Sequence, residues 1–408
     1  MKVLVALEAH FLSRPGKGVF GLGPLNYSFW GRYLDVFGSV LVLARVAKQS
    51  IDYEGFSISS GPRVEFIELH DFYGPYEYWL NYFTIANTVK KVINEADAYI
   101  LRVPGTIGWL AYKFLKKNNR SFALEVVGDP WESLGQNTVR SLTRPFARVF
   151  ARLQLKKMCR DALAVSYVTN WTLQNRYPSR YPERAIGCSS IELEAKYILD
   201  RVPERILRFS DMPSLSKQKS DPFRIGFIGS FNVMYKAPDI HLLAISRCIQ
   251  QGLNVVFLLV GDGKHRLEME NLAKKLGIER QVHFLGQLPP GEAIFGFLDT
   301  LDLYLIASLT EGLPRSLIEA MARGCPAIGT RVGGIPELLE ERYLVEPGDP
   351  DALAAKIMEV YKDKSQLSLM AERNLRKARE YCREILSERR RSFYTNVKLL
   401  SSAHREHG

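Results

Sequence analysis

The sequence predicts an α/β protein made of two doubly wound domains, each with a parallel sheet covered by helices on both faces. The chain has 408 residues, enough for two or three domains of roughly 150 residues each. Short apolar runs alternate with stretches of helical period in a βαβα order, which favours parallel sheets. Residues 201–222 are rich in Ser, Pro and charge, as linkers are.

These observations predict a domain over 1–200, a linker over 201–222 and a second domain over 223–364. The polar helical segment 365–408 is expected to pack back across both domains. In the first half, we expect strands near 2–7, 39–43, 64–69, 98–102, 121–127 and 162–168, and helices near 24–37, 76–95, 106–118 and 145–160.

The same alternation restarts after the linker. The strand-like runs are RIGFIG, NVVFLLVG, QVHFLG, LDLYLIAS and PAIGT, and the helices between them begin near Pro238, Lys264, Glu292 and Pro314. In open parallel sheets, ligands bind beyond the carboxyl ends of the strands. Two such domains that face each other predict a cleft, and glycine-rich strand-to-helix loops favour a phosphate ligand there.

Composition narrows the class of protein. The chain has 55 Lys and Arg against 44 Asp and Glu, a formal net charge of +11, which leaves an anionic ligand, nucleic acid or a membrane surface open as partners. The five cysteines are scattered, which argues against a disulfide frame or a zinc site and favours a reducing cytoplasm. The apolar run between Lys2 and Glu8 is too short for a signal peptide. Every apolar run is shorter than the ~18 residues of a spanning helix.

The segment richest in candidate site residues is LDLYLIASLTEGLPRSLIEAMARGCPAIGT, residues 301–330. Glu311 falls in a loop after a strand, and Pro314 suits the first turn of the helix that holds Glu319. Backbone amides over 312–315 can then hold an anion at the helix N-terminus. The alternative is structural, with Glu311 as a helix-dipole partner and Glu319 as a solvated residue.

This segment, followed by GTRVGGIPELL, resembles the retaining nucleotide-sugar glycosyltransferases of family 4, which include glycogen synthase and surface-polysaccharide enzymes and have the GT-B fold. The resemblance covers roughly 223–363, including GFIGSFNVMYKAPDIHLLAI, LLVGDG, VHFLGQL and VEPGDPDALAAKI. It continues more weakly through EVVGDPWES in the first half. It implies a metal-independent, hexosyltransferase-type enzyme that transfers a sugar from a nucleotide diphosphate donor to a hydroxyl of a surface glycan or lipid-linked saccharide. Retention implies same-face transfer in which the leaving phosphate takes the acceptor proton.

The resemblance also implies roles for individual residues. Glu319 would bind the ribose hydroxyls, Glu311 would contact the donor sugar near the reacting carbon, and Lys236 would neutralise the diphosphate. The family pattern has Arg directly after the glycine of the first strand, whereas this chain has Ser230. Arg315 is the best-placed source of compensating charge, with a solvent-facing role as the open alternative. The expected catalytic residues are Glu311 and Lys236, and the expected donor-binding residues are Glu319, Ser230, Arg315, Gly312, Leu313, Gly21 and Gly23.

Two short motifs are misleading. The run Gly16 to Gly21 satisfies G-x-G-x-x-G, but it does not follow its strand directly, as a dinucleotide-binding turn must. We interpret it as a glycine-rich loop where Gly21 and Gly23 let backbone approach the donor phosphates, or else as a plain surface loop. Asp349 to Asp351 spells D-x-D, but Asp349 suits the N-cap of the following helix. We therefore expect no catalytic metal and no cofactor besides the nucleotide-sugar co-substrate.

His10 and Asp129 are acceptor-side candidates because both follow strand-like runs, although a structural role explains either one. The predicted helix 145–160 places apolar residues at helical spacing, with Arg144, Arg148, Arg152 and Lys156 at intervals of four. This pattern fits a helix on an anionic membrane surface, at its inner face. It also fits a helix that packs on its own sheet.

Two rival functions stay open. One is a nucleotide-sugar epimerase of the same fold, and the other is a non-catalytic, membrane-recruited protein that binds a nucleotide sugar, suggested by Ser230 in place of the family arginine. The pattern of basic and aromatic residues shows no nucleic-acid-binding motif, so nucleic acid is not an expected partner. The donor base, either sugar and the oligomeric state are not predicted.

Overall fold

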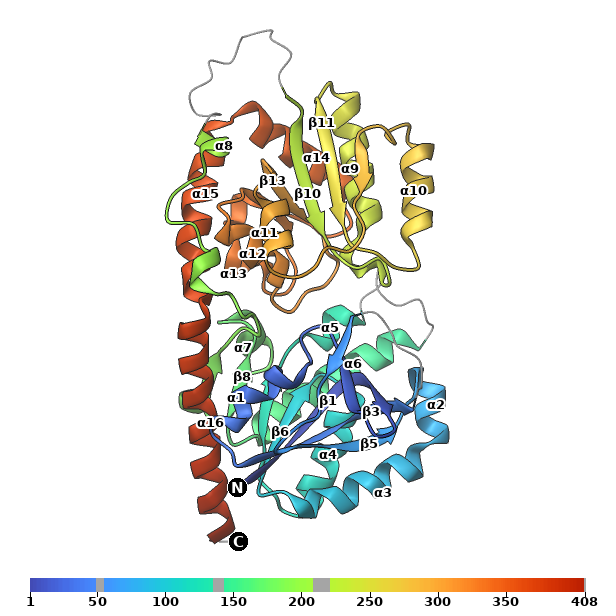
Figure 1. Ribbon diagram of the computed structural model, residues 1–408, viewed down its shortest axis with the longest axis vertical. Coiled ribbons are helices and arrows are strands. Elements are labelled where there is room, and N and C mark those ends of the chain that lie inside the picture. Colours follow the sequence, from blue (N-terminus) through green and yellow to red (C-terminus); the bar gives the residue numbers. More distant parts are fainter. Residues whose placement is uncertain (49–54, 135–142, 208–220, 407–408) are drawn as a thin grey trace. The chain divides into compact units, whose positions relative to one another are not determined.

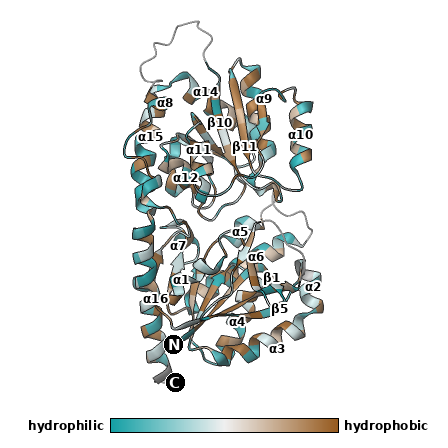
Figure 2. Cartoon of the chain, viewed as in Figure 1, coloured by the Kyte–Doolittle hydropathy of each residue, from teal (hydrophilic) through white to brown (hydrophobic). Residues whose placement is uncertain are grey.

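A computed structural model describes residues 1–48, 55–134, 143–207 and 221–406 (Figure 1). Contacts divide the chain into two units. Unit 1 comprises Met1–Pro130, Phe146–Cys188 and Leu386–Gly408, and unit 2 comprises Trp131–Pro145 and Ser189–Ile385. Apolar residues gather in the strands of both sheets (Figure 2). Within the described ranges, no helix combines the length and the apolar character needed to span a bilayer.

The sheet of unit 1 is mainly parallel. Its parallel strands are β1 (Lys2–Arg14), β3 (Ser39–Lys48), β5 (Val64–His70), β6 (Ala98–Val103), β7 (Ala123–Val126), β8 (Val165–Tyr167) and β9 (Ala185–Gly187). They pair in the order β5-β3-β1-β6-β7-β8-β9. Short strands β2 (Gly18–Leu22) and β4 (Phe56–Ile58) add an antiparallel extension beside β1. The helices of this unit include α2 (Gly74–Leu80), α3 (Tyr82–Val92), α4 (Thr106–Lys117), α6 (Arg144–Asp161) and α7 (Thr172–Arg176).

The prediction of a glycine-rich loop after the first strand is wrong for most of that segment, which forms a β-hairpin instead. Strand β1 continues to Arg14 and turns back as β2, so Gly21 is a strand residue, paired with Phe11. A Cβ on Gly21 would lie 2.0 Å from the Leu25 carbonyl oxygen. Gly23 follows the strand at φ +59°, a left-handed conformation that favours glycine. Close backbone packing therefore explains Gly21, and the left-handed conformation explains Gly23. The helix predicted over 24–37 is only two short turns, η1 (Tyr27–Trp30) and α1 (Gly31–Leu34).

A buried carboxylate attaches the C-terminal helix α16 (Arg383–Glu406) to unit 1. Glu125 on β7 forms an ion pair with Arg102 on β6. It also accepts hydrogen bonds from Tyr33 of α1 at 3.0 Å and from Tyr394 of α16 at 2.5 Å. Burial, the largest single effect, would raise the pKa of Glu125, but Arg102 together with the hydrogen bonds from Tyr394 and Tyr33 and the charge of Arg32 holds the pKa of Glu125 below its usual value. The preceding helix, α15 (Ser365–Ala378), packs in unit 2.

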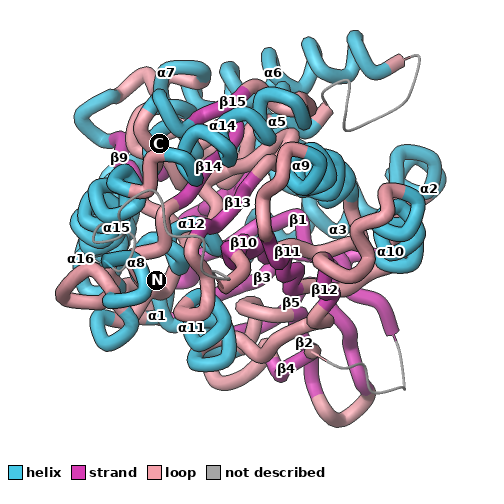
Figure 3. The backbone as a smooth tube through the Cα atoms, turned by 90° about the horizontal axis from the view of Figure 1, so that it is seen from above, coloured by secondary structure: helices cyan, strands magenta, loops and turns pink. Residues whose placement is uncertain are grey.

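The sheet of unit 2 is wholly parallel in its described strands, in the order β12-β11-β10-β13-β14-β15. The strands are β10 (Phe223–Ile228), β11 (Val255–Val260), β12 (Val282–Phe284), β13 (Leu303–Ile306), β14 (Ala327–Thr330) and β15 (Leu344–Val345). The first five coincide with the five predicted runs. The helices are α9 (Pro238–Gln250), α10 (Arg266–Lys275), α11 (Glu292–Leu298), α12 (Arg315–Ala322), α13 (Ile335–Leu338), α14 (Pro350–Lys362) and α15. Helix α9 packs with α10 and α14, and α12 packs with α11 and α15 on the other side of the sheet (Figure 3).

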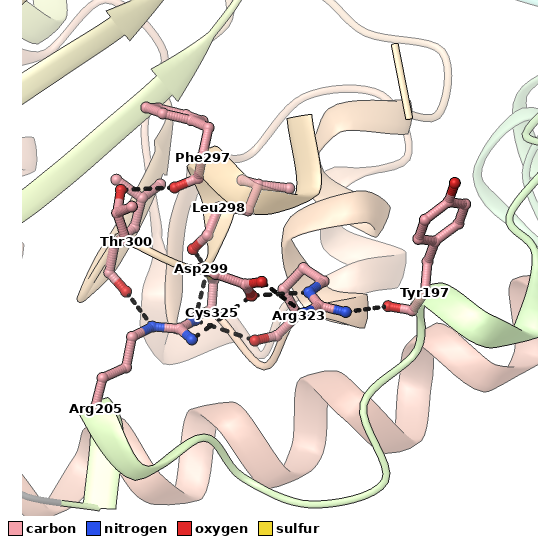
Figure 4. Close-up of polar contacts among 9 residues, drawn as sticks. Tyr197, Arg205, Phe297, Leu298, Asp299, Thr300, Arg323 and Cys325 are labelled. Atoms are coloured by element: carbon pink, nitrogen blue, oxygen red, sulfur yellow. Dashed lines mark hydrogen bonds and ion pairs between the residues drawn. The ribbon is translucent and has the colours of Figure 1, made fainter. Parts of the chain in front are cut away.

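The chain joins unit 2 before the predicted linker. Arg205, on α8 (Glu204–Leu207), donates to the Leu301 carbonyl oxygen at 2.7 Å and to that of Arg323 at 3.1 Å. Arg323 pairs with both carboxylate oxygens of Asp299 and donates to the Tyr197 carbonyl oxygen at 3.1 Å (Figure 4). These contacts hold the segment from about 197 to 205 on unit 2. Unit 2 accordingly includes the chain from Ser189 onward, whereas the sequence predicted a domain end at 200. Of the predicted linker, 208–220 lie outside the described residues.

Candidate functional site

Two neighbouring strands bring the main candidate residues of unit 2 together. Strand β10 pairs in parallel with β13 through Ile225 opposite Leu303 and Gly226 opposite Tyr304. The loops that follow the two strands therefore start from the same edge of the sheet. The backbone N–H of Leu309 in one loop donates to the Tyr235 carbonyl oxygen in the other at 2.7 Å.

Lys236 and Glu311 form an ion pair across these two loops. Lys236 ends η5 (Met234–Lys236) in the loop after β10, and Glu311 follows β13. The Ser308 hydroxyl donates to the same carboxylate oxygen of Glu311 at 2.7 Å. The two charged side chains are only 16% and 8% exposed. Burying such a pair costs solvation free energy, so it is weak evidence for stability and is better explained by a role at a site.

Glu319 lies on α12, one helical turn after Arg315. Arg315 is exposed and Glu319 is half-buried. Burial raises the pKa of Glu319, and Arg315 partly offsets this. Burial also raises the pKa of the Tyr304 hydroxyl, and the charges of Glu319 and Glu311 add to that rise. Both carboxylates therefore influence the pKa of Tyr304.

The loop around Glu311 is held by glycines that the sequence analysis did not single out. Gly334 donates its backbone N–H to the Gly312 carbonyl oxygen at 2.7 Å. A Cβ on Gly333 would lie 1.9 Å from the Glu311 carbonyl oxygen. Gly333 also donates its N–H to Glu132 at 3.2 Å, within the EVVGDPWES motif. The Gly-Gly pair in GTRVGGIPELL was the available signal, since adjacent glycines indicate close backbone approach.

The other residues of unit 2 that were predicted to bind the donor differ in exposure. Ser230 is exposed, and its hydroxyl accepts from the Asn232 N–H at 3.2 Å. Leu313 is buried at 9% exposure. Helix α12 begins at Arg315 with Pro314 as its N-cap, one residue later than predicted. Its end agrees with the prediction, since Gly324 has φ +62°.

His241 is a buried residue that ties the two site loops together. It lies on α9, and its Nδ1 is 2.8 Å from the Ala237 carbonyl oxygen. Its Nε2 accepts from the Ala307 N–H at 3.1 Å. Because a backbone N–H only donates, Nε2 carries no proton and Nδ1 is the donor. Ala237 follows Lys236 directly, and Ala307 precedes Ser308, so this side chain fixes the base of each loop. Burial lowers the pKa of His241 to about 4.

The two acceptor-side candidates of unit 1 differ in what their side chains can still bind. Asp129 is 1% exposed, and its two carboxylate oxygens are taken by Arg176 and Tyr177. These contacts favour the structural interpretation of Asp129. His10 is 34% exposed, and its Nδ1 lies 2.6 Å from Asp71. It does not end its strand as predicted, because β1 continues into the hairpin with β2.

Asp349 has the capping role that the sequence predicted. Its carboxylate accepts from the N–H of Asp351 at 3.0 Å and of Ala352 at 2.9 Å, at the start of α14. The described part of the chain contains no group of three or more His, Cys, Asp or Glu side chains that could hold a metal ion.

The candidate residues of unit 2 lie within the segment of the chain that matches a known family. Residues 222–363 match the family model described as "Glycosyl transferases group 1", which includes all the candidate residues of unit 2. The chain is 28% identical over 327 residues to "Protein CapJ" of Staphylococcus aureus, covering 79% of this chain and 78% of that protein. It is 34% identical over 179 residues to "N-acetyl-alpha-D-glucosaminyl L-malate synthase" of Bacillus anthracis, covering 42% and 45%.

Solved structures show the fold of the whole chain. Anabaena HepE in complex with UDP and glucose superposes with a TM-score of 0.62 at 18% identity, covering 95% of this chain and 98% of that one. WaaG, a glycosyltransferase involved in lipopolysaccharide biosynthesis, superposes with a TM-score of 0.62 at 16% identity, covering 96% and 99%. The chain has the GT-B fold of two parallel-sheet α/β domains, as predicted.

The bond pattern of His241 predicts a pH-dependent loss of stability. Unfolded histidine has a pKa of about 6.5. Between pH 6.5 and 4, His241 is therefore protonated in the unfolded chain and neutral in the folded chain. The folded state loses stability as pH falls through this window, by about 3 kcal/mol in total. In His241→Phe this loss is absent, so the difference in unfolding free energy between wild type and variant shrinks from pH 7 to pH 4. Urea unfolding at both pH values measures it.

The matched control is Ile245→Ala, which removes buried volume one turn further along α9. Its destabilisation is expected to be the same at both pH values. A His241→Phe difference that stays constant with pH would show that the buried histidine does not titrate as its contacts require.

Proposed function

We propose that the chain is a retaining, hexosyltransferase-type glycosyltransferase of family 4, which moves a sugar from a nucleotide diphosphate donor to a hydroxyl of a surface-glycan or lipid-linked saccharide acceptor. The observation that carries the proposal is the buried Lys236–Glu311 ion pair at the carboxyl edge of the unit 2 sheet, inside the segment that matches the group 1 family. HepE with UDP and glucose supports a nucleotide-sugar donor. WaaG and relatives such as the putative colanic acid glycosyltransferase WcaL support a polysaccharide acceptor.

In this proposal each charged residue handles one part of the donor. Lys236 neutralises the diphosphate, on which negative charge grows as the sugar departs. Glu311, held by Ser308, contacts the donor sugar near the reacting carbon. In the absence of donor, the two residues neutralise each other in a largely buried position. Donor binding exchanges that ion pair for contacts with phosphate and sugar, while the ties through His241 and Leu309 hold the loops together.

Glu319 is proposed to accept hydrogen bonds from the ribose hydroxyls, which require an ionised carboxylate. Arg315 opposes the effect of burial on the pKa of Glu319, and we propose it as the second cation near the donor in place of an arginine at Ser230. Gly312 and Leu313 line the same loop ahead of α12. The acceptor hydroxyl attacks the face that the phosphate leaves, and the leaving phosphate takes its proton.

Helix α6 supports a peripheral contact with an anionic membrane. The interpretation that its apolar face packs on the sheet holds only for its C-terminal half, where Leu155 and Met158 are buried. In the N-terminal half, Phe146, Val149, Phe150 and Leu153 are 81%, 48%, 61% and 59% exposed. Arg144, Arg148, Arg152 and Lys156 lie on the same helix. An exposed apolar stripe beside basic residues is typical of a helix that lies in a bilayer interface.

Substitution of the two glutamates separates donor binding from turnover. Glu319→Ala is expected to weaken nucleotide binding about tenfold or more, because ribose contacts are made in the ground state and the transition state alike. Glu311→Gln is expected to lower kcat by about tenfold or more with a smaller change in donor KM. A thermal-shift panel of nucleoside diphosphates first selects the base, and nucleoside diphosphate release then measures turnover.

The control for these variants is Glu292→Gln, an exposed glutamate on α11. If both site variants keep donor affinity and kcat within twofold of wild type, the assignment of the two glutamates is wrong. Product that forms from the donor sugar without any acceptor or hydrolysis would indicate the epimerase. Nucleotide binding without turnover would indicate the non-catalytic protein.

Transfer is expected to survive excess EDTA. The carboxylate of Asp349 caps the N-terminus of α14. In the proposal, Lys236 neutralises the diphosphate in place of a metal ion. The measurement compares initial transfer rates with and without EDTA after dialysis. Activity that disappears and returns specifically with manganese would reject metal independence.

Binding to anionic vesicles is expected to depend on the exposed face of α6. Phe146→Ser combined with Leu153→Ser should reduce co-sedimentation with anionic vesicles at least fivefold, and raised salt should weaken the wild-type interaction, since the Debye length is ~10 Å at 0.1 M salt. Leu399→Ser, which changes an apolar residue of α16 that is 65% exposed, is the control. Equal pelleting of the double variant and wild type would exclude α6 as the anchor.

A further inference from the structure

A polar and aromatic cluster lies at the carboxyl edge of the unit 1 sheet and shares no residue with the donor-binding residues proposed in unit 2. Strand β1 pairs with β3 through Ala6 opposite Leu43 and then through His10 opposite Arg45. The register therefore shifts between these pairs, and extra residues of β1 bulge out of the ladder. Bulges often re-aim side chains next to active sites. Asp71 directly follows β5, the strand on the other side of β3.

His10 and Asp71 form a pair with one hydrogen-bonding atom left over. The His10 Nδ1 lies 2.6 Å from the Asp71 carboxylate. An ionised carboxylate only accepts, so Nδ1 carries the proton and Nε2 is the remaining polar atom of the ring. No partner for Nε2 is found among the described residues. Asp71 is 15% exposed and His10 is 34% exposed. The carboxylate thus anchors a ring that reaches solvent.

An exposed aromatic ring lies against this imidazole. Tyr73 stacks on His10 with ring centroids 4.5 Å apart and an angle of 14° between the planes. Its side chain is 66% exposed. Sugars are bound by this combination of groups, because the C–H face of a pyranose packs on an aromatic ring while its hydroxyls bond to polar atoms at the ring's edge.

Among the described residues, the cation at the base of the cluster is Arg45, which already has partners. Arg45 pairs with Glu8 at 3.0 Å and donates to the Phe72 carbonyl oxygen at 3.0 Å. Its guanidinium also lies 4.8 Å from the centre of the Phe72 ring. Glu8 in turn accepts from the Ile107 N–H at the start of α4 at 3.0 Å. Because Arg45 is committed to these partners, the chemistry favours an uncharged sugar unit over a phosphate.

We propose that His10, Asp71 and Tyr73 form a saccharide subsite that binds a sugar unit of the acceptor. Tyr73 packs on the sugar face, Nε2 of His10 bonds to a hydroxyl, and Asp71 is a positioning residue that fixes the orientation of the imidazole. This inference rests on the proposed glycosyltransferase function. It adds the residues that select the acceptor, which the donor-binding residues of unit 2 do not supply.

The decisive measurement compares transfer to acceptor with hydrolysis of the donor in the same enzyme. His10→Ala and Tyr73→Ala are expected to raise the acceptor KM at least tenfold while donor hydrolysis stays within twofold of wild type. Tyr73→Phe keeps the ring and loses only the hydroxyl, which hydrogen-bonds to Asp71, so its acceptor KM is expected to rise less than that of Tyr73→Ala. Tyr76→Ala is the matched control, since Tyr76 is also an exposed tyrosine of the same segment, at 73% exposure, without a ring contact to His10.

The contribution of Asp71 is tested by partial rescue. Asp71→Ala frees the imidazole to rotate and is expected to raise acceptor KM about as much as His10→Ala. Asp71→Asn, which still accepts through its amide oxygen, is expected to recover part of the loss. Equal effects of Asp71→Ala and Asp71→Asn would overturn the orienting role.

The remaining outcomes separate this subsite from the proposed function. Transfer that is unchanged in His10→Ala and Tyr73→Ala overturns the subsite, and so does an equal fall of transfer and donor hydrolysis. If the wild type neither transfers nor hydrolyses, the proposed function fails. Binding of fluorescently labelled protein to an array of hexose- and N-acetylhexosamine-terminated oligosaccharides then decides about the subsite. Binding lost in Tyr73→Ala and kept in Tyr76→Ala supports it, whereas equal binding or none by wild type overturns it.

Discussion

The parallel pairing of β10 with β13 is the constraint on which the candidate donor site depends. Because the two strands run in the same direction side by side, the loops that follow them meet at one edge, although Lys236 and Glu311 are far apart in sequence. Three contacts then hold the loops together: the ion pair, the bond from Leu309 to Tyr235, and the two bonds of His241. In the proposed function, only the ion pair opens when a charged donor binds. The proposal thus assigns the reaction to one set of groups and the support of the loops to another.

Unit 1 uses the same edge of its sheet in another way. The buried carboxylate of Glu125 is bonded to Arg102 and two tyrosines, one of them from the C-terminal helix. Asp129 is likewise committed to Arg176 and Tyr177. A buried carboxylate without such partners would be costly. His10 stands apart because only one of its two ring nitrogens is engaged, which is why it carries a binding hypothesis and Asp129 does not.

Several predictions from the sequence failed for a shared physical reason. The glycine-rich stretch after β1 reads locally as a loop, but β1 extends to Arg14 and needs a partner strand for its edge, which β2 supplies. The chain was also expected to change domains at 201, whereas Arg323 bonds to Tyr197 before that position and Arg205 bonds to Arg323 after it. In both places contacts between residues distant in sequence take part, since β2 also pairs with β4 through Phe20 opposite Ile58, and no local pattern reports them.

The sequence by itself determined the α/β class, the five main strands of unit 2, the cap at Asp349 and the choice of Lys236, Glu311 and Glu319 as candidates. The class, the strands and the cap follow from local periodicity and capping chemistry. The three candidates follow from the resemblance of their segment to a known family. Only the tertiary structure decided that Lys236 meets Glu311, that His241 supports both loops, and that Asp71 and Tyr73 join His10. Strand order and register bring these side chains together, and a sheet's order is set by packing between distant segments rather than by the local sequence of any strand.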